Sequence, residues 1–344
     1  MSARFVFGSG ALVVCLLLAA AGPAAAQTPT APANDDCLAC HGDSTATRAD
    51  GSSIAVAPEV FGKSTHSTIA CVSCHADLAK TSEWPHPEKL QKVSCGTCHG
   101  QQGSNYDDSV HGRAVAKAGL AVAPRCSTCH GTHDIQRKGD PESSVHRGKI
   151  AGTCTKCHEG IEPLYAKSVH AQPLGPGNSA AAVCSDCHTA HRIQRGDTDT
   201  WRLSVIDECG TCHLARISSY RDNFHGQRTA LGSARTATCS YCHDHHVILP
   251  ASNTASTVSP QNLVNTCRQC HAQATEAFVK YDPHADKLDP SRSAAVYWTY
   301  RIMKVLLFGV FATFGVHTLL WFPRSYKARR ELRAAAAAGG DTAS

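Results

Sequence analysis

Cysteine and histidine recur along the chain in one fixed arrangement: two cysteines separated by two residues, with a histidine directly after the second. Such a thiol pair can hold a metal ion, close a disulfide or add to an unsaturated organic cofactor, and the adjacent imidazole can ligate a metal. All but one of the 19 cysteines belong to nine such units. The units are Cys37-Cys40-His41, Cys71-Cys74-His75, Cys95-Cys98-His99, Cys126-Cys129-His130, Cys154-Cys157-His158, Cys184-Cys187-His188, Cys209-Cys212-His213, Cys239-Cys242-His243 and Cys267-Cys270-His271.

The histidine after every pair distinguishes these chemistries. A zinc ion ordinarily takes two Cys-x-x-Cys pairs together and needs no histidine after each one. A disulfide framework gives no reason for such a histidine. Cys-x-x-Cys-His is, however, the attachment sequence of c-type haem, in which the thiols bind the two vinyl groups and the histidine ligates the iron. We therefore expect nine covalently attached haem c groups. Their expected proximal iron ligands are His41, His75, His99, His130, His158, His188, His213, His243 and His271.

A second set of histidines lies at regular distances from the motifs. In the later repeats one histidine follows the first motif histidine by 12 or 13 residues, and another follows the second motif histidine by three. Together with His66 and His86 of the first repeat, these make nine histidines for nine irons. Methionine occurs only at Met1 and Met303, so we expect two histidine ligands per iron and low reduction potentials. The candidate distal ligands are His66, His86, His111, His133, His170, His191, His225, His246 and His284.

Some of these assignments leave alternatives open. His146 and His245 are left over, and His245 competes with its neighbour His246. In the first repeat Leu78 stands where the later repeats have a histidine, and His86 is the nearest substitute. Which distal histidine serves which iron cannot be read from the spacing.

The motifs are arranged as a repeat, which predicts the architecture. Successive repeats begin near residues 37, 95, 154, 209 and 267, which gives four dihaem units and a final single-haem half unit. Aromatic residues make up only 6% of the chain, so porphyrins rather than aliphatic side chains should form its core. We expect a mainly α fold with much coil, little or no β-sheet and one C-terminal transmembrane helix.

Both ends of the chain indicate a membrane location. Residues 1–26 have the charged, apolar and small-residue segments of a signal peptide, and Cys15 would be removed with it. Residues 293–323 form an apolar stretch flanked by aromatic residues, long enough to cross a bilayer. The basic and alanine-rich residues 324–344 predict a cytoplasmic tail. Residues 27–292 would then be a periplasmic nonahaem domain on the inner membrane.

On these motifs, residues 37–271 resemble the multihaem cytochromes c of the doubled Cys-x-x-Cys-His, cytochrome c3-like group. The resemblance implies an electron-transfer protein rather than an enzyme. Reductases of similar families replace a motif histidine by lysine or leave one iron without a distal ligand; all nine motifs here end in histidine. A reductase of a small nitrogen or sulfur oxyanion with one five-coordinate haem, and a haem-rich scaffold subunit without catalysis, remain alternatives. The sequence contains no basic run with interleaved aromatic residues, so it gives no support for nucleic-acid binding.

The C-terminal segment suggests the partners. Its ending, His317 to Arg324, is similar to that of membrane-bound multihaem cytochromes that we expect to pair with an integral membrane cytochrome b or another quinone-reactive subunit. Gly309, Thr313 and His317 share one helix face, where His317 could contact a quinone, ligate a haem or bond to a neighbouring helix. The last motif, at Cys267, is nearest in sequence to the membrane. The predicted function is electron relay between the quinone pool and periplasmic or outer-membrane redox proteins.

Overall fold

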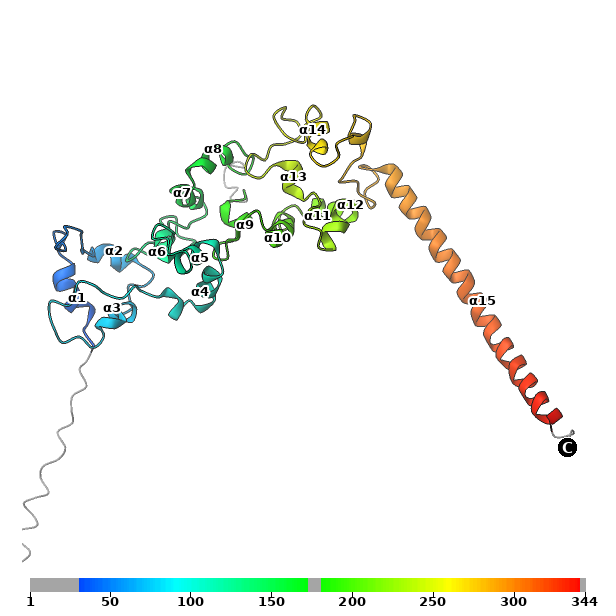
Figure 1. The fold of residues 1–344 in the computed structure, drawn as a ribbon, viewed down its shortest axis with the longest axis horizontal. Helices are drawn as coiled ribbons and strands as arrows, with labels where there is room; N and C mark the ends of the chain where they lie inside the picture. Colours follow the sequence, from blue (N-terminus) through cyan, green and yellow to red (C-terminus); the bar gives the residue numbers. More distant parts are fainter. Residues whose placement is uncertain (1–30, 173–180, 341–344) are drawn as a thin grey trace, which may run out of the picture. The chain divides into compact units, whose positions relative to one another are not determined.

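The protein is represented by a computed structural model that describes residues 31–172 and 181–340. Short helices joined by irregular segments are followed by one long helix, α15 (Figure 1). The expected signal peptide, residues 1–26, and Cys15 lie outside the described residues. The chain divides into two compact units, Met1–Lys149 and Ile150–Ser344. This division falls just before the motif at Cys154, where the sequence predicts the start of a repeat.

The helices of the first unit are α1 (Asn34–His41), α2 (Pro58–Lys63), α3 (Cys71–Cys74), η1 (Ala76–Leu78), η2 (Cys95–Thr97), α4 (Gly100–Asp107), α5 (Val110–Ala116) and α6 (Cys126–His130). Those of the second unit are α7 (Ile150–Thr155), η3 (Glu159–Ile161), α8 (Glu162–Tyr165), α9 (Cys184–His188), α10 (Asp199–Gly210), α11 (Leu214–Asp222), α12 (Phe224–Ala230), α13 (Cys239–His243), α14 (Leu263–Arg268), η4 (Phe278–Lys280) and α15 (Ala294–Gly340).

The described residues contain no β-sheet, and Thr47 and Ser53 form an isolated bridge. This confirms the expected fold class, mainly α with much coil. The same residues bury very little hydrophobic surface: the buried hydrophobic side chains are Val205, Ile206, Tyr220, Ala234 and Ala274. More serines and threonines than aliphatic residues are buried. A protein of this size needs a larger apolar core to fold, so the polypeptide alone does not supply it.

The haem motifs are wound into single helical turns. The backbone N–H of His99 donates to the carbonyl of Cys95 over 2.9 Å, and that of His271 donates to Cys267 over 2.8 Å. Residues three and four apart in such a turn lie on one face, so both thiols and the imidazole are presented together. The short motif helices therefore follow directly from the Cys-x-x-Cys-His spacing.

A tyrosine hydroxyl positions the second motif in three of the repeats. The Tyr106 hydroxyl donates to the carbonyl of Pro124, and that of Tyr165 donates to Ala182, over 2.8 and 2.9 Å. Tyr220 likewise donates to Ala237 over 2.9 Å. In every case the accepting carbonyl lies two residues before the first cysteine of a motif. Each tyrosine thus ties the helix after one motif to the chain that enters the next.

The residue after the second motif of a repeat adopts an unusual backbone conformation. Gly131, Thr189 and Asp244 have φ of 82°, 62° and 70°, with ψ near 180°. This region is essentially restricted to glycine, and other residues occupy it at a cost of about 1–3 kcal/mol. The turn redirects the chain directly after the motif histidine.

Helix α15 carries the long apolar segment. Residues 305–322 contain no Asp, Glu, Lys or Arg, and at 1.5 Å per residue they extend about 27 Å, close to the hydrocarbon thickness of a bilayer. Their large side chains are exposed, for example Phe311 at 67% and Phe314 at 66%. By length and composition this helix can cross a membrane. Beyond the predicted membrane span, which ends at residue 323, α15 continues through Pro323 to Gly340, because the alanines and arginines of this part are good helix formers.

We expect the Tyr220→Phe variant to be destabilised by about 1–3 kcal/mol, because the Ala237 carbonyl loses a buried donor. Guanidinium unfolding of the haem-loaded protein measures this as a lower midpoint. The matched control is Tyr281→Phe, since Tyr281 is 58% exposed. Equal midpoints for the two variants would show that the tyrosine does not stabilise the fold.

Candidate haem-binding sites

The motif histidines lie opposite the predicted distal histidines. Seven of the nine motif histidines face one, with ring centroids 5.8 to 6.3 Å apart. The pairs, with the motif histidine first, are His41–His86, His99–His66, His75–His133, His213–His170, His188–His246, His271–His225 and His243–His284. No pair joins a motif histidine to one of the left-over histidines.

The distance within these pairs fits an iron atom between the rings. Imidazoles in direct stacking contact lie much closer together. Two iron–nitrogen bonds of about 2 Å, plus about 1.1 Å from each ligating nitrogen to its ring centroid, give about 6.2 Å. Six of the seven pairs measure 6.1 to 6.3 Å. The donor set and its spacing therefore fit haem iron with two axial histidines.

In six of the seven pairs the two histidines come from different repeats, whereas His41 and His86 both belong to the first repeat. The distal histidine 12 residues after a first motif faces the first motif of the next repeat, as His170 faces His213 and His225 faces His271. The distal histidine three residues after a second motif faces the second motif of the preceding repeat, as His246 faces His188. Iron ligation therefore crosslinks each repeat to its neighbours within a unit.

Hydrogen bonds at Nδ1 orient several rings. His41 Nδ1 lies 2.8 Å from the Ile54 carbonyl and His86 Nδ1 lies 3.0 Å from the Pro87 carbonyl. A carbonyl can only accept, so both rings carry their proton on Nδ1 and keep the Nε2 lone pair free for a metal. His75 Nδ1 differs, since it is buried without a hydrogen-bond partner among the described residues.

Burial keeps many of these histidines neutral. It is the largest cause that lowers their pKa, and the charge of a neighbouring histidine lowers the pKa further. Neutral imidazole is the form that binds a metal, so the surroundings favour ligation at neutral pH. The residues with a lowered pKa are His133, His170, His188, His225, His243, His246 and His284.

A polar residue two positions before the distal histidine holds its segment in place. The Ser64 hydroxyl donates to the carbonyl of Ile135 over 3.2 Å, and Ser168 donates to that of Ile248 over 3.3 Å. Both serines are buried, at 5% and 1% exposure. Asn223 plays the same part with its amide. Sequence reasoning missed these residues, although Ser or Asn recurs at this position before His66, His111, His170 and His225.

The left-over histidines have other surroundings. His245 is exposed and lies 3.8 Å from the Asp244 carboxylate, so of the two neighbours it is His246 that faces a motif histidine. His146 Nδ1 accepts from the backbone N–H of Gly148. The other members of the predicted set, His111, His130, His158 and His191, each have interaction partners. Their assignment as proximal or distal ligands stays a prediction.

The motif cysteines place successive attachment points side by side. They form no disulfides. In each repeat the first cysteines of the two motifs are close enough for one thiol to shift the pKa of the other; the pairs are Cys37–Cys71, Cys95–Cys126, Cys154–Cys184 and Cys209–Cys239.

The end of one repeat is also close to the start of the next. Burial raises the pKa of Cys187 to about 11, and the neighbouring Cys209 adds to the shift. Burial and the neighbouring Cys267 likewise raise the pKa of Cys242. Haems attached at these thiols would be neighbours along each unit.

The thiols and imidazoles do not form zinc-type clusters. Among the described residues no three side chains of His, Cys, Asp or Glu come together around a point that could hold a metal ion. Tetrahedral zinc sites need three or four such ligands. Pairs of opposed imidazoles are instead the arrangement that a porphyrin iron requires, because the porphyrin supplies the other four ligands.

Comparison with known proteins agrees with this geometry. Residues 56–131 and 140–214 match the family model described as cytochrome c7 and related cytochrome c. Each match contains three motifs, so its bounds differ from those of the predicted dihaem repeats. The chain is 23% identical over 318 residues to the high-molecular-weight cytochrome c of Nitratidesulfovibrio vulgaris (strain Hildenborough), with 70% of this chain and 56% of that protein covered. No solved structure matches the chain.

The Ser168→Ala variant tests the support of a distal histidine. Ser168 donates to Ile248 and accepts from the backbone N–H of His170, so its loss should cost about 1–3 kcal/mol and loosen His170. We expect a lower guanidinium midpoint and a new high-spin ferric signal in electron paramagnetic resonance (EPR). The control is Ser204→Ala, whose hydroxyl bonds only within the exposed face of α10. A wild-type spectrum and midpoint for Ser168→Ala would contradict the assignment.

Proposed function

We propose that this chain, whose residues 56–131 and 140–214 are cytochrome c7-like multihaem repeats, is a membrane-anchored periplasmic cytochrome that relays electrons through nine haem c groups. The opposed histidine rings carry this proposal. Seven motif histidines have a second imidazole at the distance that an iron bound between the two rings would require. Substrate could not reach an iron held in this way. An iron closed on both faces can exchange electrons but has no open position for chemistry.

The residues of each site divide the work of a relay between them. Haem c, when bound, supplies a one-electron couple between ferric and ferrous iron. The two thiols fix the porphyrin edge, and the neutral imidazoles hold the same ligand set in both oxidation states. The Nδ1 hydrogen bond of His41 to the Ile54 carbonyl prevents the ring from turning. Because little has to move when the charge changes, the reorganisation energy of electron transfer stays small.

The series of attachment points provides the path. The first cysteines of the two motifs lie close together in each repeat, and Cys187 and Cys242 lie beside the first cysteines of the following repeats. Electrons would pass from porphyrin edge to porphyrin edge along each unit. We extend two-histidine ligation to the remaining motifs of His130 and His158, with His111 and His191 as distal ligands.

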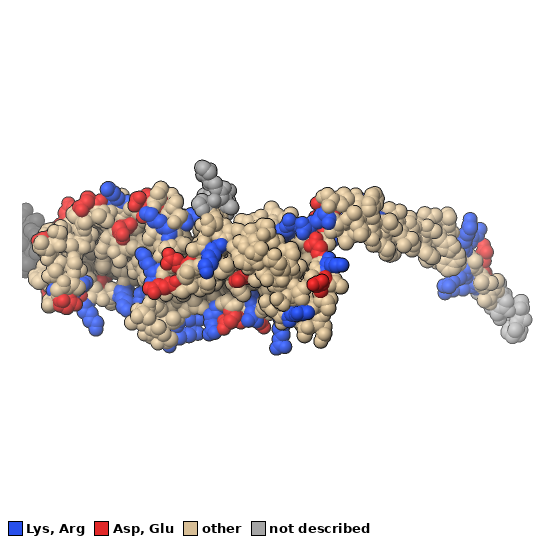
Figure 2. All heavy atoms as spheres, turned by 90° about the horizontal axis from the view of Figure 1, so that it is seen from above, with Lys and Arg blue, Asp and Glu red and all other residues tan. Residues whose placement is uncertain are grey.

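Helix α15 supports attachment to a membrane. The side chains of residues 305–322 are apolar and exposed, and Lys and Arg gather at the two ends of this stretch (Figure 2). The cluster of Arg324, Lys327, Arg329, Arg330 and Arg333 favours a cytoplasmic end, which puts the haem domain in the periplasm. We propose the inner membrane as its location.

The same helix supports an integral membrane partner. Gly309 and Ala312 leave a hollow on its surface, lined also by Arg301, Lys304 and Phe308. Small residues allow close helix packing, and His317 lies two turns further along in the bilayer, where an ionisable side chain favours a protein neighbour over lipid. We propose a cytochrome b or another quinone-reactive subunit as the neighbour, and periplasmic or outer-membrane redox proteins at the other end of the relay.

Ligand variants test the haem sites, and two adjacent histidines offer a matched pair. The fully oxidised protein should show only low-spin ferric haem by EPR, with nine haems per chain by pyridine haemochrome assay. His246→Ala should convert one haem to a high-spin form, since His246 faces His188 at 6.2 Å. His245→Ala should leave the spectrum unchanged, because His245 is exposed and bound to Asp244.

Other results would overturn parts of the proposal. A substantial high-spin signal in the wild-type protein would reveal an open iron, and nitrite, hydroxylamine and tetrathionate would then be tested as substrates. Conversion by His245→Ala instead of His246→Ala would reverse the assignment of the two neighbours. A haem count clearly below nine would remove some of the motifs from the relay.

Charged substitutions in α15 test the anchor. Each arginine near the centre of a membrane helix costs about 2.5–3.5 kcal/mol of insertion free energy. We expect the Val310→Arg/Phe314→Arg variant to leave carbonate-washed membranes, whereas the wild-type chain stays. Leu332→Arg, within the basic cluster and outside the apolar stretch, is the control and should stay. Haem staining of the released protein shows that its haem domain has matured. Retention of the double variant would show that α15 is not the anchor.

A further inference from the structure

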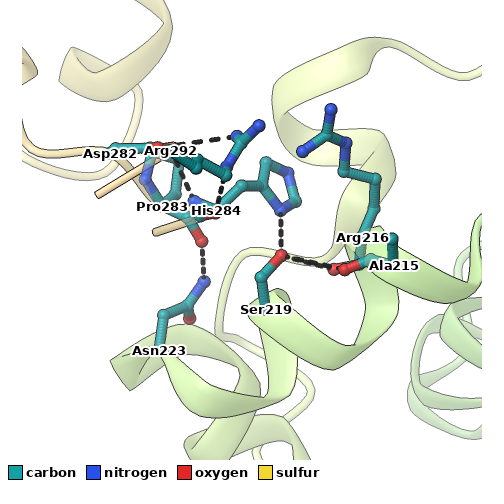
Figure 3. A network of polar contacts seen from close by, with 8 residues as sticks. All are labelled: Ala215, Arg216, Ser219, Asn223, Asp282, Pro283, His284 and Arg292. Carbon is teal, nitrogen blue, oxygen red and sulfur yellow. Dashed lines mark hydrogen bonds and ion pairs between the residues drawn. The ribbon is translucent and has the colours of Figure 1, made fainter. Parts of the chain in front are cut away.

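The segment between the last distal histidine and the membrane helix is held by an unusually complete set of polar contacts (Figure 3). The backbone N–H of His284 donates to the Asp282 carboxylate over 2.8 Å, and its carbonyl accepts from Arg292 Nε over 2.6 Å. The preceding carbonyl, that of Pro283, accepts from the Asn223 amide over 2.6 Å. Arg292 stands two residues before α15 begins. The peptide of His284 is therefore fixed on both sides.

The ring of His284 is fixed as well. Its Nδ1 lies 3.2 Å from the Ser219 hydroxyl, which itself donates to the carbonyls of Ala215 and Arg216. With its proton engaged in this way, the hydroxyl can only accept from the ring, so His284 carries its proton on Nδ1. Nε2 is left as the ligating atom, and the opposed motif histidine is His243 at 6.3 Å. Through its ligand His284, the haem attached at Cys239 and Cys242 would be the one joined to helix α15. By distance along the sequence, the haem of the following motif, at Cys267, is nearer to this helix.

Two arginines stand beside this ring. The guanidinium groups of Arg216 and Arg292 both lie on the side of the His284 ring that faces away from Ser219 (Figure 3). Arg292 also pairs with Asp282 at 3.5 Å. The pKa of His284 is lowered by burial first, then by the charges of His243, Arg216 and Arg292, while Asp282 raises it. Other charged groups around this segment, Asp286 and Asp289, line the same surface cavity as the two arginines.

For three of the other buried distal histidines, the nearby charges besides those of histidines are carboxylates. The charge that acts on His133 besides neighbouring histidines is the Asp134 carboxylate, and His170 has Asp186. His246 has Asp244 beside it. A carboxylate near an axial ligand stabilises the ferric state, which carries one more positive charge than the ferrous state, and an arginine destabilises it. The haem ligated by His284 would consequently differ from its neighbours, because two arginines as well as the Asp282 carboxylate stand beside its distal ligand.

We propose that Arg292 and Arg216 are positioning residues for the haem attached at Cys239 and Cys242. Arg292 locks the distal ligand His284 to the start of the membrane helix, and the two cations raise the reduction potential of this haem above that of haems with carboxylates beside their ligands. Within the chain, electrons then gather first at the haem tied to α15. The inference rests on the two-histidine ligation of the proposed function.

Redox titration of the full-length, detergent-solubilised protein tests this inference, with haem absorbance and EPR as readouts. In the Arg216→Gln/Arg292→Gln variant, one haem equivalent should become harder to reduce, because two positive charges near its ligand are lost. We expect a change of about tenfold in its reduction equilibrium constant, since solvent in the cavity partly screens the two charges. Arg292→Lys, which keeps the charge, should restore most of the shift. Arg221→Gln is the matched control, since Arg221 lies on the same helix α11 but pairs with Asp207. The component that moves should be the one that turns high-spin in His284→Ala.

The outcomes separate the two proposals. An unchanged titration of the double variant, in a protein whose oxidised wild-type form is entirely low-spin, overturns the inference and leaves the relay intact. The same holds if the component that moves is not the His284 haem, or if Arg221→Gln moves it equally. High-spin haem in the wild-type protein overturns the ligation itself. Should the double variant fail to mature, Arg216→Gln alone carries the test, because its guanidinium makes no hydrogen bond to the His284 backbone.

Discussion

In the proposed relay, the structure depends on one requirement: each iron has to be held between two neutral imidazoles that come from distant parts of the sequence. His75 and His133 are 58 residues apart in the sequence, as are His188 and His246. In each pair the ring centroids are nevertheless only 6.2 Å apart, the spacing that fits an iron between the rings. Each such ligation closes a loop and joins one repeat to the next. In a chain with so few buried hydrophobic side chains, these crosslinks and the porphyrins they hold must supply most of the stabilisation that an aliphatic core supplies elsewhere. Folding and haem attachment are consequently one process.

The same requirement explains the buried polar residues. A porphyrin covers the space between segments but cannot set the backbone register, and irregular segments leave their carbonyls without helical partners. Ser64 and Ser168 satisfy such carbonyls from the segment that carries a distal histidine. Tyr220 does so next to a motif, and burial raises the pKa of its hydroxyl to about 12, so it remains a donor. The small polar set thus places the ligands to within the tolerance that iron demands.

Much of this was predictable because haem attachment has a strict local signature. The Cys-x-x-Cys-His spacing predicts the short motif turns, and the shortage of hydrophobic residues predicts a coil-rich fold without sheet. The choice of partner was not predictable, since it depends on how the repeats stack: His170 could equally have served its own repeat by spacing alone, but faces His213. The anchoring serines escaped notice for a similar reason. A serine two residues before a histidine has meaning only when the carbonyl that it reaches, 71 or 80 residues away, is known.

Ligation also decides which haem is mechanically joined to the membrane helix. By sequence the last motif, at Cys267, is nearest to α15, but His271 takes its partner from α12, through His225. The segment that leads into α15 instead starts from His284, which faces His243 and is fixed by Asn223, Ser219 and Arg292. Electron exchange depends on the distance between cofactors rather than on distance along the chain. A partner packed against α15 would therefore find its position set relative to the haem of Cys239 and Cys242, because that is the haem whose ligand and membrane helix belong to one rigid segment.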